Sequence, residues 1–71
     1  MDHRIREIRK GVGVSQEQLA HMVNLTRQTI SNFERGVSSP SLLDMKRISQ
    51  ALRVPLPDLL SPELIKPSVA A

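Results

Sequence analysis

Two helix-start signals, at Ser15 and at Thr26, constrain the fold of this chain more than any other feature. Ser15 and Gln18 have the spacing of a capping box, in which each side chain bonds the backbone of the other residue. Thr26 is a second cap residue, and an apolar-periodic segment begins directly after it. Asn24 lies between the two signals, and asparagine tolerates the left-handed backbone that ends a helix. The sequence therefore predicts two short helices joined by a tight turn over residues 24–26.

Three further helices are predicted, and no segment alternates apolar and polar residues as a strand does. One covers about residues 2–10, before the helix-ending glycines at 11 and 13. Another begins after a cap at Ser41, with Asp44 as its capping partner, and a last short helix carries Leu59 and Leu60. The predicted fold class is all-α with five helices. Helical spacing and apolar character assign these side chains to the core: Ile5, Ile8, Leu19, Ala20, Val23, Ile30, Phe33, Leu42, Met45, Ile48 and Leu52. The other methionines are also assigned to core filling.

Composition limits how such a chain can be stabilised and what it can bind. Its 71 residues are enough for one domain, expected over residues 1–60 with a short tail over 61–71. It has no cysteine, so aliphatic residues and the single aromatic residue, Phe33, have to supply the core. The net charge of +3 favours an anionic partner. No segment resembles a membrane span or a signal peptide, so we expect a soluble cytoplasmic protein without a membrane partner.

The second helix of the pair, predicted over residues 27–35, has an inward face with Ile30 and Phe33 and an outward face of hydrogen-bond donors. At about 100° per residue, the outward arc holds Arg27, Gln28, Ser31, Asn32 and Arg35. Arginine pairs bidentately with guanine in the major groove of DNA, and glutamine or asparagine pairs bidentately with adenine. The spacing is that of a helix-turn-helix motif. We therefore predict that this helix reads base edges, with Arg27 and Gln28 deepest in the groove and Ser31 the weaker reader.

Four residues of the motif are expected to contact or support the DNA backbone: Ser15, Gln16, Thr26 and Arg35. Arg35 lies at the far end of the reading helix, where phosphate is the expected partner. Gln16 opens the preceding helix, where backbone N–H groups attract phosphate. Its side chain is also expected to steady Gln28.

The order of these motifs resembles the Cro and phage-repressor type of helix-turn-helix protein, also called the Xre family. The resemblance covers about residues 4–60 and is carried by residues 15–20, 26–31, 34–36, 40–42 and 51–56. It implies the five-helix fold of lambda-repressor-like DNA-binding domains, with the helix-turn-helix at the second and third helices. It also implies that the third helix reads the major groove and that the protein binds a pseudo-palindromic operator as a two-fold dimer.

The resemblance implies particular roles as well. The residues at DNA-contact positions of the family are Gln16, Arg27, Gln28 and Asn32. Arg9 and Glu34 fall where many members hold a buried ion pair, which we expect to be structural, because breaking such a pair typically costs about 3–5 kcal/mol. The chain resembles the compact stand-alone members of the family, so its dimer contacts are expected on the fifth helix and the tail, with Leu60, Leu64 and Ile65 as candidates.

The function predicted from these features is that of a homodimeric transcriptional repressor. An antitoxin that binds a toxin protein and its own operator stays open as an alternative, because the same fold serves both roles. RNA binding is less favoured, because A-form major grooves exclude helices and no stacking aromatic residue is available on the surface. An enzyme is not expected, since His3 and His21 lack catalytic partners. The glycines at 11 and 13 do not form a phosphate loop, and no metal or cofactor is expected.

Overall fold

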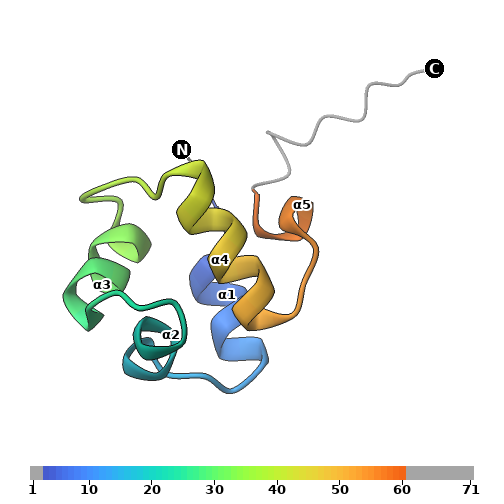
Figure 1. Ribbon diagram of the computed structural model, residues 1–71, viewed down its shortest axis with the longest axis horizontal. Coiled ribbons are helices and arrows are strands. Elements are labelled where there is room, and N and C mark those ends of the chain that lie inside the picture. The colour runs from blue at the N-terminus through green and yellow to red at the C-terminus, as the bar shows by residue number, and fades with distance from the viewer. Residues whose placement is uncertain (1–2, 61–71) are drawn as a thin grey trace.

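The computed structural model describes residues 3–60, and within that range the chain forms five helices and no strand (Figure 1). The helices are α1 (Ile5–Gly11), α2 (Gln16–Met22), α3 (Arg27–Arg35), α4 (Leu42–Leu52) and α5 (Leu56–Leu59). This arrangement confirms the predicted all-α, lambda-repressor-like fold. No helix in this part of the chain is long and apolar enough to cross a bilayer.

The helix ends follow the predicted capping chemistry. Ser15 with Gln18 and Ser41 with Asp44 form complete capping boxes, in which side chain and backbone bond reciprocally. The Thr26 hydroxyl accepts the backbone N–H of residue 29 at 3.1 Å. Left-handed residues end the paired helices, with φ of 59° at Asn24 and 78° at Gly36. Local sequence therefore determines where α2, α3 and α4 begin.

The start of α1 differs from the prediction, because the two residues before it make backbone contacts with residues distant in sequence. The backbone N–H of Arg4 donates to the Leu59 carbonyl oxygen at 2.6 Å, and His3 pairs with Leu60 in an isolated antiparallel bridge. The helix accordingly begins at Ile5, not at residue 2. Its end also lies later than predicted, since Gly11 is still helical and the left-handed turn is at Gly13, with φ of 78°.

The core lies where α4 meets the other helices, and α4 contacts α1, α2 and α5 directly. Ten apolar side chains are buried there: Ile5, Leu19, Ala20, Val23, Ile30, Phe33, Met45, Ile48, Leu52 and Leu59. Two predicted core residues are instead on the surface, with Leu42 69% exposed and Met22 50% exposed. Leu42 is the first residue of α4, one turn before Met45, and the packed part of the helix begins only at Met45. The buried stripe of α4 includes Ser49, whose hydroxyl donates to the Lys46 carbonyl at 2.8 Å.

The two ends of the domain carry different elements, with α3 on the left and α5 on the right in Figure 1. Leu60, one of the predicted dimer contacts, is half-buried and directly follows α5. Leu64 and Ile65, the other two, lie outside the described residues, as does the rest of the expected tail over 61–71.

The energetic cost of a left-handed residue can be tested at Arg53, which ends α4 with φ of 60° and ψ of 42°. A side chain raises the energy of that conformation, and glycine does not have this penalty. We expect Arg53→Gly to raise the free energy of unfolding by about 0.5–1 kcal/mol in urea titrations. The matched control is Arg47→Gly, which places glycine at an exposed site inside α4 and should lower stability by about 1 kcal/mol. Equal losses in both variants would contradict this account.

Candidate nucleic-acid interface

The interface is built on α2 and α3, and the turn over residues 24–26 fixes the position of one helix relative to the other. The backbone N–H of Leu25 donates to the Ala20 carbonyl at 2.8 Å, so the turn is closed by a hydrogen bond back onto α2. Leu25 is partly buried and packs against the core. Behind α3, Ile30 and Phe33 are buried, which fixes the rotation of this helix about its axis. The face opposite them is therefore presented outward in one orientation.

That outward face of α3 carries the five donor residues that the sequence singles out. Arg27, Gln28 and Arg35 are exposed, and Ser31 and Asn32 are half-buried. The first turn of α3 contains no acidic residue. The one carboxylate of the helix belongs to Glu34, whose side chain is only 3% exposed and already paired with Arg9. The accessible part of α3 is thus positively charged and rich in donors, as a surface that meets DNA acceptors and phosphates requires.

Three of these residues are linked to one another along the helix. The Asn32 Oδ1 atom accepts a hydrogen bond from Gln28 Nε2 at 3.0 Å and another from Arg35 Nη2 at 3.0 Å. These contacts were not predicted from the sequence. Their spacings of four and three residues are those at which helical side chains meet, so the signal was present in the sequence.

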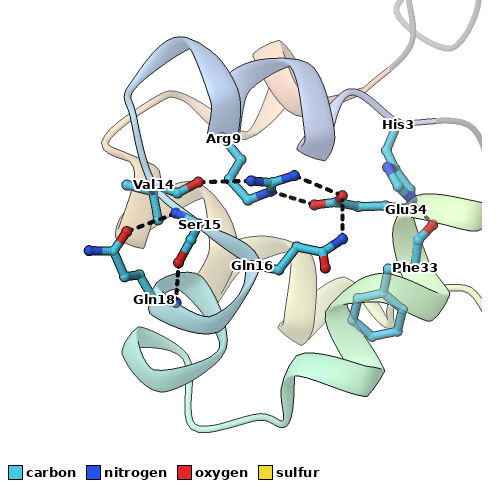
Figure 2. Close-up of polar contacts among 8 residues, drawn as sticks. All are labelled: His3, Arg9, Val14, Ser15, Gln16, Gln18, Phe33 and Glu34. Carbon is cyan, nitrogen blue, oxygen red and sulfur yellow. Dashed lines mark hydrogen bonds and ion pairs between the residues drawn. The ribbon is translucent and has the colours of Figure 1, made fainter.

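Gln16 lies beside α3, but it does not contact Gln28 as expected. Its Nε2 atom donates to Glu34 Oε1 at 3.0 Å (Figure 2). A carboxylate is a stronger acceptor than a neutral carboxamide, which accounts for this choice of partner. The expectation that Gln16 steadies Gln28 was therefore wrong for this structure, in which the contact to Gln28 comes from Asn32.

A buried ion pair lies directly behind the interface. Arg9 Nε donates to Glu34 Oε2 at 2.7 Å and Arg9 Nη2 donates to Oε1 at 3.1 Å, while Nη1 donates to the Val14 carbonyl at 2.9 Å (Figure 2). The two side chains are 9% and 3% exposed. One guanidinium therefore joins α1, the segment that leads into α2, and α3.

The surroundings of Glu34 lower its pKa. Burial alone raises the pKa of this carboxyl group, but the hydrogen bonds from Arg9 and Gln16 and the positive charges of Arg9 and Arg6 outweigh that effect. The net pKa lies below the usual value, so Glu34 is ionised near neutral pH.

A second contact behind α3 was also absent from the sequence analysis. His3 Nε2 lies 3.0 Å from the Phe33 carbonyl oxygen, and since a carbonyl can only accept, the ring nitrogen is the donor (Figure 2). Thirty positions separate the two residues, and no local pattern connects them. His21, by contrast, is exposed on α2. Within residues 3–60, no three His, Cys, Asp or Glu side chains gather closely enough to hold a metal ion.

Comparisons with known proteins agree with this geometry. A family model described as Helix-turn-helix matches residues 5–59, from the first residue of α1 to the last of α5. A protein named as an HTH-type transcriptional regulator from Methanothermobacter thermautotrophicus is 54% identical over 48 residues, which cover 68% of this chain and 70% of that protein. Control protein C.BamHI of Bacillus amyloliquefaciens is 43% identical over 58 residues, covering 80% of this chain and 72% of that protein. The crystal structure of the restriction-modification controller protein C.AhdI from Aeromonas hydrophila matches with a TM-score of 0.77 at 35% identity, over 80% of this chain and 86% of that one.

The ion pair can be tested by removing its partners one at a time and together. Arg9→Met or Glu34→Met leaves the other charge buried without its partner, and we expect each to lower the free energy of unfolding by about 3–5 kcal/mol. The double variant leaves neither charge and should be closer to the wild type than either single variant, as measured by urea denaturation. A double variant that loses as much stability as the two single variants together would show no coupling between Arg9 and Glu34, and would contradict this account.

The lowered pKa of Glu34 also predicts a pH dependence. A carboxyl group with a depressed folded-state pKa contributes stability that is complete above its unfolded value of about 4.5 and is lost as pH falls through the folded value. The difference in unfolding free energy between the wild type and Glu34→Gln should therefore be constant from about pH 6 to pH 7 and shrink below about pH 4.5. Taking the difference cancels the titration of the other carboxyl groups. A difference that stays constant down to pH 3 would argue against this role for Glu34.

Proposed function

The chain belongs to the helix-turn-helix family of transcriptional regulators, in its Cro/C1 or Xre type, and from this membership we propose that it represses transcription by binding a pseudo-palindromic operator as a homodimer. The observation that carries the proposal is the exposed donor face of α3, which the buried Ile30 and Phe33 hold in one orientation. Members of this family bind double-stranded DNA.

Base reading is assigned to the outward face of α3. Arg27 is the first residue of the helix and Gln28 the second, and both are exposed. The first turn of a recognition helix enters the major groove deepest, so these two side chains reach the base edges first. Arg27 matches the O6 and N7 acceptors of guanine, and Gln28 matches the N6 donor and N7 acceptor of adenine.

Phosphate binding is assigned to the residues that border α3. Arg6, Arg35 and Gln16 line a hollow beside the Arg9–Glu34 pair. Gln16 uses one Nε2 hydrogen for Glu34, and its second N–H is available to a phosphate oxygen. Ser15 and Thr26 support this surface by capping α2 and α3. Such contacts fix the register of the protein on the duplex without selecting a sequence.

Dimerisation is proposed because a single small module makes too little contact for tight specific binding. One module of this kind buries roughly 600–1,000 Å² on DNA, whereas specific interfaces bury about 1,000–2,500 Å². Because α3 and α5 lie at opposite ends of the domain, a two-fold axis near α5 would place the two α3 helices far apart (Figure 1). Half-sites about 34 Å apart on one face of the DNA then fit such a dimer. Leu60, beside α5, remains the candidate contact within the described residues.

Selection from a pool of random duplexes, at a stated salt concentration, tests the proposal directly. We expect a selected pseudo-palindrome with half-sites one helical turn apart, and sedimentation of a complex of two chains per duplex. In vitro transcription from a promoter that carries the selected site should then decrease as the protein is added. Selection of no sequence would contradict the proposal. A second protein that co-purifies in stoichiometric amount would support the antitoxin alternative instead.

Arg27 and Arg35 provide a matched pair of variants, since one is assigned to a base and the other to a phosphate. We expect Arg27→Ala to weaken binding to the selected site by about 1–3 kcal/mol and to relax preference at one base pair per half-site. Arg35→Ala should weaken binding to specific and random duplexes alike and reduce the salt slope of log K by about 1 per chain. Fluorescence anisotropy titrations over a salt series measure both effects. Identical behaviour of the two variants would show that Arg27 contacts phosphate only.

A further inference from the structure

We propose that Asn32 is a positioning residue, which orients Gln28 for adenine and does not itself read a base as the sequence analysis expected. The inference rests on the proposed function, because it concerns how α3 selects its operator. It begins from the two hydrogen bonds that converge on Asn32 Oδ1.

The chemistry of the partners determines the orientation of both carboxamides. Arginine has donors only, so the Asn32 atom that lies 3.0 Å from Arg35 Nη2 has to be the oxygen. The Gln28 atom that lies 3.0 Å from the same oxygen must then be its nitrogen. A carboxamide oxygen has two lone pairs, and Gln28 and Arg35 together occupy both.

This arrangement leaves different hydrogen-bond donors and acceptors free on Asn32 and on Gln28. Bidentate adenine recognition needs an oxygen that accepts from N6 and an N–H that donates to N7. The Asn32 oxygen is already saturated, which leaves this residue only its Nδ2 donors. Gln28 still has its whole Oε1 atom and the second hydrogen on Nε2, and these are the groups that adenine requires. The geometry therefore assigns adenine to Gln28.

Asn32 is also better anchored than Gln28. Asn32 is half-buried, whereas Gln28 is exposed. The side-chain oxygen of Asn32 is bonded to Arg35 as well as to Gln28, and its backbone carbonyl accepts from the Val37 N–H at 2.9 Å and from the Ser38 N–H at 3.3 Å. A fixed side chain that contacts a mobile one reduces the conformational entropy that the mobile one loses on binding.

The experiment measures base preference with Gln28→Ala, Asn32→Ala, the double variant and Asn32→Asp. Each full-length protein is titrated with the selected duplex and with duplexes changed one base pair at a time in both half-sites. We expect Gln28→Ala to reduce preference at one adenine–thymine pair by about 5- to 150-fold. Asn32→Ala should reduce preference at the same pair, and the double variant should lose no more there than Gln28→Ala alone.

Asn32→Asp is the matched control, because its oxygens can still accept from Gln28 and Arg35. Its negative charge should weaken binding to all duplexes, while preference at the Gln28 pair is retained. Thermal unfolding of each variant checks that the fold persists, and loss of fold would not alter one base pair selectively. The inference is overturned if Asn32→Ala relaxes a different base pair from Gln28→Ala, or if Asn32→Asp loses the preference as Asn32→Ala does. A wild-type protein without sequence preference would overturn the proposed function as well.

Discussion

The contact between Arg9 and Glu34 is the interaction on which the geometry of this domain depends. A core of ten apolar side chains holds the helices together and determines which side of α3 is buried, but the hydrophobic effect is not directional and does not by itself fix the position of α3 against α1. The guanidinium bonds a carboxylate on α3 and the Val14 carbonyl before α2 at the same time. Gln16 of α2 donates a further hydrogen bond to the same carboxylate. Buried pairs contribute little net stability, so we ascribe to this one chiefly the position of α3 relative to α1 and to the segment before α2.

Local chemistry made most of the fold predictable from the sequence. The starts of α2, α3 and α4 follow from Ser15, Thr26 and Ser41, because a capping residue acts on the backbone only three positions away. The predictions were wrong where the local structure or the burial of a residue depends on residues distant in sequence. The backbone before α1 bonds the carbonyl of Leu59, which is distant in sequence. Leu42 is exposed because the packed part of α4 begins only at Met45. Periodicity identifies the apolar face of a helix but not how much of that face is covered.

In the candidate site, too, the features of a single segment were predictable and the contacts between distant residues were not. The outward donors of α3 follow from residue type and helical spacing, both of which are properties of a single segment. The ion pair behind them was expected only from the family resemblance, since nothing local links Arg9 to Glu34. The partner of Gln16 could not be predicted, because choosing between Glu34 and Gln28 requires the distance between two helices. The contact from His3 to the Phe33 carbonyl gave no signal in the sequence at all.

The division of α3 into a buried side and an exposed side has an evolutionary consequence. Ile30 and Phe33 support folding, while Arg27 and Gln28 make no contribution to the buried core. A descendant of this chain could therefore acquire a new target by exchanging surface residues, without destabilising its interior. The bond between Gln28 and Asn32 limits that freedom, because replacing Asn32 removes the acceptor that orients Gln28, and replacing Gln28 leaves the Asn32 oxygen bonded to Arg35 only. Positions 28 and 32 should therefore covary among diverging copies of such a regulator.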